Sequence, residues 1–304
     1  MSHEPVLLKE SIDFLVTEKN GIYFDGTAGF GGHSEEILNT LEKGKLIATD
    51  KDLSAFEYCK NKFSGDNRFS IFNTGFTNID SISKFEFIEQ FDGILADLGV
   101  SSFQLDTVEA GFTFREDAAL DLRMNKAEGI SASDLLNKSS QEDIAKILFE
   151  YGEEKNSRLI AKKIIEFRLS EKISRTSQLK KIIEQITPER FLNKTLSRVF
   201  QALRIYVNNE LEELKIFIDK SVSLLKPGGR IVILSYHSLE DRIVKEKIKY
   251  ESLSCICPPG TPICICGKVK RLKLVTHKPV VPSDLEIEKN RRARSAKMRV
   301  AERV

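Results

Sequence analysis

Short runs of apolar, strand-forming residues recur through the first hundred positions, and segments with helical spacing separate them. The runs are GIYFD (21–25), KLIATD (45–50), RFSIFN (68–73) and DGILAD (92–97). Strands that are apolar at nearly every position and alternate with helices are typical of a parallel sheet, because such a sheet is covered on both faces. The sequence therefore predicts an α/β fold.

Three of these runs end on an aspartate, namely Asp25, Asp50 and Asp97. In open α/β sheets, ligands bind in a crevice outside the carboxyl ends of the strands. We therefore expect the three carboxylates to line one ligand-binding crevice.

The alternation of strands and helices stops near residue 110, and only helical signals follow as far as residue 206. Ser140 can cap a helix that ends at Gly152. Two further amphipathic segments follow, at 157–169 and 177–186. This stretch predicts an all-helical insertion.

The α/β pattern resumes after the helical stretch. A long amphipathic helix is expected over 208–225, followed by a break at KPGG and a strand that starts at Arg230. Residues 295–302 alternate between apolar and basic side chains, which is typical of a half-buried antiparallel strand. The expected organisation is one sheet domain in two parts, 1–109 and 207–304, with a helical domain over 110–206.

A glycine-rich loop, FDGTAGFGGHS (24–34), follows the first predicted strand. A dinucleotide fingerprint that starts at Gly29 would need glycine at position 34, where the chain has Ser34. Ser34 is a natural helix N-cap, and Glu35 and Glu36 would then lie in the first turn, where carboxylates oppose a bound pyrophosphate. The loop therefore favours a cationic ligand without phosphate, and S-adenosylmethionine fits that description.

Other polar segments are expected at the same crevice. Asp50 is placed to accept hydrogen bonds from ribose hydroxyl groups. Asp97 begins a polar loop, DLGVSSFQ, and the segment SYHSLEDR brings His237 and Asp241 to the end of a later strand. Two alternatives to an enzyme that uses S-adenosylmethionine as methyl donor stay open at this point. They are a Rossmann oxidoreductase and a non-catalytic RNA-binding assembly factor.

Longer motifs occur in a fixed order from residue 3 to residue 303. They are HEPVLL.E, DGTAGFGGHS, DGILADLGVSS.QLD, LDLRM, YGEE, FQALRIYVNNEL, LKPGGRIVILSYHSLEDRIVK and RSAKMRVAER. Together they resemble the family of bacterial ribosomal RNA small-subunit methyltransferase H. The resemblance implies a class I (Rossmann-like) S-adenosylmethionine-dependent methyltransferase sheet with an inserted all-helical domain. It also implies methyl transfer to N4 of a cytosine in the decoding region of 16S rRNA, within the small ribosomal subunit.

The resemblance also implies which residues contact the cofactor: Gly32, His33, Ser34, Asp50, Phe76, Asp97 and Gln104. In the reaction, Asp97 would orient the cytosine amine, and His237 or Asp241 would assist or accept the proton. A Pro-Pro-aromatic sequence after Asp97 would supply an aromatic side chain to stack on the base, and this chain has none there. The stacking side chain therefore has to come from another part of the chain. The candidates are Phe103, Phe112, Phe114 and Tyr236.

Basic residues are concentrated at the C-terminal end of the sequence. Residues 268–304 carry twelve Lys or Arg and four Asp or Glu, while the whole chain has a formal net charge of +2. The rest of the chain is therefore mildly acidic, and a basic segment on a mildly acidic body indicates a polyanionic partner. The expected RNA contacts are Arg291, Arg292 and Arg294, which directly precede the last predicted strand.

Four of the five cysteines lie in CICPPGTPICIC, at positions 255, 257, 264 and 266. Cys255, Cys257, Cys264 and Cys266 could bind a structural zinc ion through four thiolates, although C-x-C is tighter than the usual C-x₂-C spacing. Free thiols are the alternative, because disulfides are rare in the cytosol. Cys59 stands alone in a predicted helix and is expected to be a small core residue.

Residues 1–20 lack the basic start and apolar stretch of a signal peptide. No apolar run approaches the roughly 20 residues that span a bilayer. We therefore expect a cytoplasmic protein that does not bind membranes. Nothing in the sequence indicates an oligomeric state.

Overall fold

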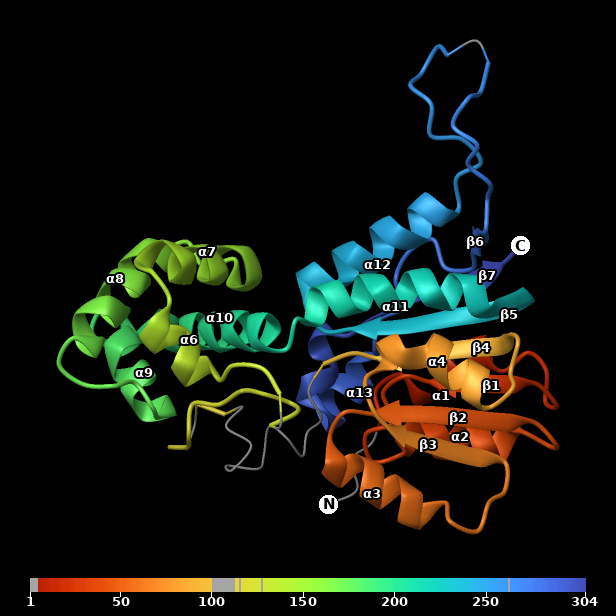
Figure 1. Ribbon diagram of the computed structural model, residues 1–304, viewed down its shortest axis with the longest axis horizontal. Helices are drawn as coiled ribbons and strands as arrows, with labels where there is room; N and C mark the ends of the chain where they lie inside the picture. The colour runs from red at the N-terminus through yellow and green to blue at the C-terminus, as the bar shows by residue number, and fades with distance from the viewer. Residues whose placement is uncertain (1–4, 100–112, 115, 127, 262) are drawn as a thin grey trace. The chain divides into compact units, whose positions relative to one another are not determined.

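The structure is a computed structural model that describes residues 5–99, 113–114, 116–126, 128–261 and 263–304. The chain divides into two compact units, one formed by Met1–Gly99 and Leu211–Val304 and the other by Val100–Glu210. The divisions at 99/100 and 210/211 lie near those proposed from the sequence, 109/110 and 206/207. Figure 1 shows a layered α/β arrangement in the first unit and a group of helices in the second.

Seven strands of the described residues form one sheet in the first unit, in the order β3-β2-β1-β4-β5-β7-β6. The first five strands run parallel, and β7 is antiparallel to both β5 and β6. The predicted parallel sheet and its late antiparallel strand are therefore confirmed. The strands are β1 (Ile22–Asp25), β2 (Lys45–Asp50), β3 (Phe69–Asn73), β4 (Phe91–Asp97), β5 (Leu225–Ser235), β6 (Leu272–Leu274) and β7 (Lys297–Arg303).

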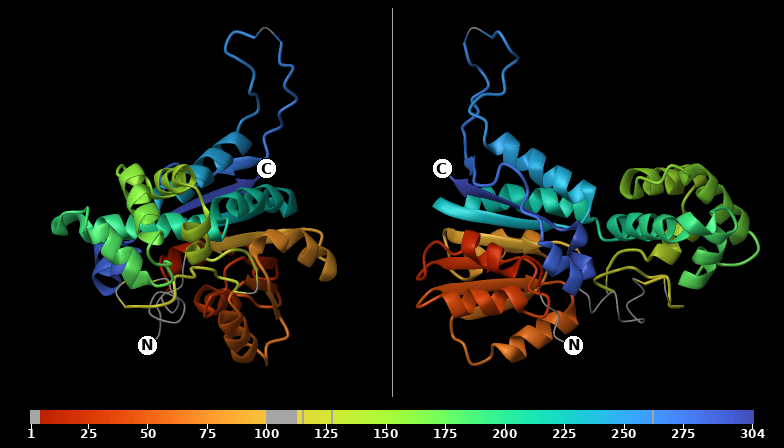
Figure 2. Two further views of the ribbon diagram at one scale, coloured as in Figure 1. Left: turned by 60° about the vertical axis from the view of Figure 1, so that its left-hand side comes forward. Right: turned by 180° about the vertical axis from the view of Figure 1, so that it is seen from behind.

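Helices cover both faces of the sheet, as the two views of Figure 2 show. On one face, apolar side chains of three helices pack around Phe24 and Phe91 in a single buried cluster. These helices are α4 (Ile79–Phe85), α11 (Glu210–Leu224) and α12 (Ser238–Glu251). On the other face, α1 (Leu8–Leu15) and α2 (Gly32–Thr40) pack around Leu46 and Val300. Burial on both faces explains why the strand sequences are apolar throughout.

The second unit consists of helices around one apolar core that includes Leu148, Ile164 and Leu203. The hydroxyl of Ser140 accepts a hydrogen bond from the backbone N–H of Asp143 at 3.1 Å, so the predicted cap is present. No helix in the described part of the chain is both long and apolar enough to cross a membrane. The helices of this unit are α6 (Ala132–Lys138), α7 (Gln141–Gly152), α8 (Ser157–Arg168), α9 (Thr176–Glu184) and α10 (Glu189–Val207).

The KPGG sequence lies inside β5, so the break predicted before Arg230 is wrong. Phe91 pairs with Leu225 and Gly93 pairs with Arg230, which shifts the register between β4 and β5. Gly228 has a φ of +83°, in the left-handed region that favours glycine. The sequence signal for a turn therefore marks an irregularity within one continuous strand.

Candidate active site

The carboxyl ends of β1, β2 and β4 lie side by side, because β1 pairs with β2 on one edge and with β4 on the other. The strand order changes direction here, and open α/β sheets bind ligands at such a switch point. Asp25, Asp50 and Asp97 are the last residues of these three strands. The fold thus brings the three carboxylates to one edge of the sheet, although Asp25 is fully buried there.

Asp25 is fully buried and stabilises the glycine loop. Its Oδ2 accepts a 2.7 Å hydrogen bond from Ser34 Oγ, and its Oδ1 accepts one from Thr27 N at 3.0 Å. Burial raises the pKa of this carboxyl, and the bond from Ser34 opposes the rise. Helix α2 begins at Gly32 with Gly31 as its N-cap, so the prediction that Ser34 caps the helix is wrong.

Ser34→Ala is expected to lower the free energy of unfolding by about 1–3 kcal/mol, because the buried Asp25 carboxyl loses a hydrogen-bond donor. Urea denaturation monitored by circular dichroism measures the change. Ser54→Ala, in the exposed first turn of α3 (Leu53–Lys62), is the matched control and should change stability by less than about 0.5 kcal/mol. Equal losses in the two variants would contradict the role given to Ser34.

Two glycines of the loop are required by close packing. A Cβ at Gly31, which has a φ of +76°, would lie 2.8 Å from the ring of Phe63. A Cβ at Gly32 would lie 2.2 Å from Cγ of Pro5. Real Cβ atoms do not approach neighbours this closely, so only glycine preserves the present backbone of the loop.

Asp50 connects the end of β2 to the glycine loop. Its Oδ2 accepts a hydrogen bond from Gly29 N at 2.8 Å, and its Oδ1 accepts one from Asp52 N at 2.8 Å. Burial raises the pKa of Asp50 to about 6. Each carboxylate oxygen can accept more than one hydrogen bond, so the ionised side chain can also accept from hydroxyl groups of a ligand.

Asp97 has neighbours from the residue after β5, from α2 and from the glycine loop. Tyr236 Oη donates to its Oδ1 at 2.7 Å, and Nδ1 of His33 lies 3.7 Å from its Oδ2. Asp97 N donates to Thr27 Oγ1 at 2.7 Å. Burial and the charge of Asp97 raise the pKa of Tyr236, which keeps the phenol protonated as a donor. The Asp97 side chain is 21% exposed, so this oriented carboxylate is accessible to a ligand.

Phe76 opens a short 3₁₀ turn, η1 (Phe76–Asn78), after β3. Its ring packs on Phe217 with the ring centroids 4.8 Å apart. A Cβ at Gly26 would lie 3.0 Å from the Cβ of Phe76. Phe76 is therefore next to the start of the glycine loop, consistent with the adenine contact that the resemblance implies.

The other aromatic candidates for stacking on a base have different positions. Phe103 and Phe112 lie outside the described residues, and so does the predicted cofactor contact Gln104. Phe114 packs on Phe200 in the core of the helical unit, with ring centroids 5.4 Å apart. Among the stacking candidates that the structure describes, Tyr236 is the one that contacts Asp97.

His237 and Asp241 are at the start of α12, and both have local partners. His237 is the N-cap, with its Nδ1 3.4 Å from Glu240 N and its Nε2 3.1 Å from Glu240 Oε1. Asp241 accepts hydrogen bonds from Arg299 Nε at 2.6 Å and Lys297 Nζ at 3.2 Å. Burial works to raise the pKa of Asp241, but these two cations hold it below its ordinary value. Asp241 thus connects α12 to β7, whereas His237 caps the helix and contacts Glu240 in its first turn.

The basic segment forms a 3₁₀ turn, η3 (Arg291–Ser295), directly before β7. Arg291, Arg292 and Arg294 are exposed. Ala293 between them is buried in the cluster beneath α1 and α2. A buried alanine thus fixes the turn that presents the three arginines.

The fold and the site together define a class I, Rossmann-like methyltransferase. The model of the MraW methylase family matches residues 1–304, and the chain therefore belongs to that family. This confirms the predicted methyltransferase activity with S-adenosylmethionine as cofactor and excludes the oxidoreductase alternative.

Curated relatives with high sequence identity carry the name ribosomal RNA small subunit methyltransferase H. The protein of that name from Caldicellulosiruptor saccharolyticus is 48% identical over 304 residues, which cover 99% of each chain. The one from Fusobacterium nucleatum subsp. nucleatum is 47% identical over 304 residues, which cover 99% of this chain and 97% of the relative. The family named from the sequence motifs is thus confirmed.

Proposed function

We propose that this protein transfers the methyl group of S-adenosylmethionine to N4 of a cytosine in the decoding region of 16S rRNA, in the small ribosomal subunit. The names of its relatives support ribosomal RNA as the substrate. The observation that carries the proposed reaction is the Asp97 carboxylate, which Tyr236 orients and which stays partly exposed. Methylation of small subunits with labelled S-adenosylmethionine, followed by nucleoside analysis, tests the proposal.

The described residues fit S-adenosylmethionine. Its sulfonium and ammonium groups are cationic, and two partly exposed carboxylates, Asp50 and Asp97, end strands at this edge of the sheet. Asp50 can accept from the ribose hydroxyls, and Phe76 is available to the adenine. In the loop, Gly32, His33 and Ser34 would contribute their backbone, since the Ser34 hydroxyl already donates to Asp25. The cofactor, when bound, supplies an electrophilic methyl group.

Methyl transfer from a sulfonium is an in-line displacement, so the protein mainly has to hold the amine, the methyl carbon and the sulfur collinear. The lone pair of the cytosine amine is delocalised into the ring, which makes N4 a poor nucleophile. An acceptor at an N4 hydrogen favours a more pyramidal nitrogen and stabilises the positive charge that develops on it. We assign this role to Asp97.

His237 and Asp241 act as positioning residues in this proposal. Both ring nitrogens of His237 face Glu240, whose Oε2 accepts from Tyr236 N at 2.8 Å. The cap of α12 thereby fixes the tyrosine that donates to Asp97. Asp241 is a weak proton acceptor because Arg299 and Lys297 stabilise its ionised form.

The exposed arginines of η3 are proposed to contact RNA phosphates. Replacing Arg291, Arg292 and Arg294 with alanine should weaken binding to small subunits. It should also make binding less sensitive to salt. The slope of the logarithm of the binding constant against the logarithm of the salt concentration should become less steep by about 0.7–0.9 for each phosphate that an arginine neutralises in the wild type. Filter binding over a series of salt concentrations measures both quantities.

The matched control replaces three exposed lysines at the opposite edge of the sheet, Lys19, Lys43 and Lys45, which lie at or before the amino end of β2. This variant removes the same charge and should keep the wild-type salt dependence. Equal changes in the two variants would mean that only overall charge matters, which would contradict a binding role for η3.

A further inference from the structure

Residues 252–271 connect α12 to β6, and Figures 1 and 2 show this loop extending away from the sheet. None of its described residues is buried. Ile263 and Ile265 are 76% and 85% exposed. Ordering the backbone costs roughly 1–2 kcal/mol per residue, and this loop buries no apolar side chain that would offset the cost. A different interaction has to stabilise it.

Four cysteine sulfurs come together within this loop, and their Sγ atoms all lie within 4.8 Å of one another. Sγ of Cys264 lies 3.5 Å from those of Cys255 and Cys266 and 3.9 Å from that of Cys257. All four thiols are free. Zinc–sulfur bonds of about 2.3 Å in tetrahedral geometry place the sulfurs about 3.8 Å apart. The four sulfurs thus have the spacing of ligands around one ion.

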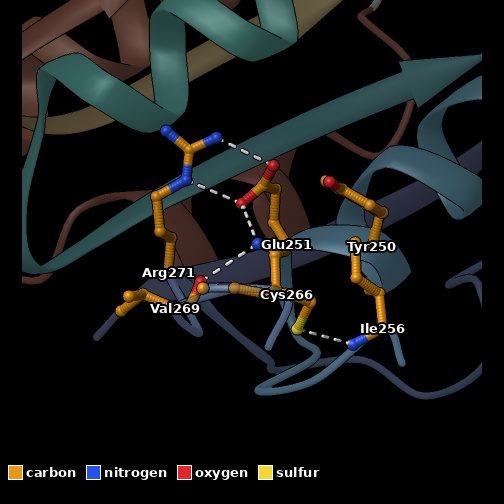
Figure 3. Close-up of a pocket in the computed structure, with 8 residues that line it drawn as sticks. Tyr250, Glu251, Ile256, Cys266, Val269 and Arg271 are labelled. Carbon is orange, nitrogen blue, oxygen red and sulfur yellow. Dashed lines mark hydrogen bonds and ion pairs between the residues drawn. The ribbon is translucent and has the colours of Figure 1, made fainter. Parts of the chain in front are cut away.

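Backbone N–H groups point to two of these sulfurs. Ile256 N lies 3.4 Å from Sγ of Cys266, as Figure 3 shows, and Cys257 N lies 3.4 Å from Sγ of Cys255. Such contacts orient ligating groups and are part of the design of a metal site. Four thiolates this close would repel one another without a cation, whereas a dication stabilises them.

The two ends of the loop are connected by a buried ion-pair cluster (Figure 3). The Glu251 carboxylate accepts from Lys268 Nζ at 2.9 Å and from Arg271 Nε at 2.7 Å. The Glu251 side chain is only 3% exposed. This cluster fixes the base of the loop, and the cysteines lie beyond it toward the tip.

We propose that Cys255, Cys257, Cys264 and Cys266 bind one Zn²⁺ ion, which holds the loop in its fold. Four sulfur ligands in tetrahedral geometry, with no open position, are typical of structural zinc. Helix α12 starts at the carboxyl end of β5 and runs back along the sheet, so the loop lies at the edge opposite the three carboxylates. The ion therefore stabilises the fold and takes no part in methyl transfer.

Elemental analysis of protein purified without chelator tests this site, and one zinc per chain is expected. The double variant Cys255→Ser, Cys266→Ser should lose nearly all of this zinc. The matched control is Cys59→Ala, which removes the buried cysteine of α3 and should keep one zinc per chain. Trypsin cleavage after Lys270 should become faster when a chelator removes the metal from the wild-type protein.

Three results would overturn the assignment. The first is purified protein with negligible zinc whose loop thiols react with a thiol reagent equally fast with and without chelator. The second is iron in place of zinc. The third is a full zinc content in the double serine variant, because the ion would then be bound elsewhere. None of these results depends on methyltransferase activity.

Discussion

Asp97→Ala is expected to lower kcat for methyl transfer by about 10²–10³-fold at saturating S-adenosylmethionine, because the variant loses an oriented charge that acts in the transition state. The Asp97 carboxylate is the partly exposed acid at the end of β4. Tyr236 donates a hydrogen bond to it, His33 lies beside it, and the backbone N–H of Asp97 donates to Thr27. Single-turnover kinetics with labelled cofactor measure the effect on the chemical step.

Tyr236→Phe is the graded control for this prediction. It keeps the Asp97 carboxylate and removes only the hydroxyl that donates to Oδ1 at 2.7 Å. A hydrogen bond to a charged group contributes about 1.5–3 kcal/mol, so kcat should fall by about 10- to 100-fold. Wild-type turnover in Asp97→Ala would exclude Asp97 from the chemistry.

Asp50→Ala is expected to weaken S-adenosylmethionine binding by about 10- to 100-fold, because ribose hydroxyls lose a charged acceptor. In the wild type, binding should also weaken as the pH falls below about 6. Burial raises the pKa of Asp50 to about 6, and below that pH the carboxyl becomes protonated and loses acceptor capacity. Calorimetric titration between pH 5 and 7.5 measures the dissociation constant.

Asp50→Asn separates the charge from the shape of this side chain. It should bind the cofactor weakly, and its affinity should not change between pH 5 and 7.5. Burial lowers the pKa of His33, which favours the neutral imidazole. Wild-type affinity that is independent of pH would contradict the role of Asp50.

Much of the fold could be predicted because local sequence carries the signal. Strands β1 to β4 are apolar at nearly every position, and their observed ends match the predicted ones to within one residue. Strand β6 has only three residues, Leu272–Leu274, which is too short to show a period. The KPGG segment carries the signal of a turn, but it lies within β5, where the register with β4 shifts between the pairs Phe91–Leu225 and Gly93–Arg230.

The positions of the site residues were predictable where the fold alone determines them. Parallel strands end at one edge, so Asp25, Asp50 and Asp97 could be placed from their strands. Their partners could not be predicted, because tertiary contacts decide them. Ser34 looked like a helix cap and instead donates to Asp25. Asp241 pairs with Arg299 only because β7 returns beside β5, fifty-eight residues later in the chain.

The most direct test uses S-adenosylmethionine labelled in its methyl group and small ribosomal subunits from cells that lack this methylation. After incubation with the protein, the rRNA is digested to nucleosides, and the labelled nucleoside is identified and mapped. The proposed function predicts label in N4-methylcytidine, at a cytosine of the decoding region. Label in any other nucleoside, or no label from folded protein that binds the cofactor, as expected for a non-catalytic assembly factor, would contradict it.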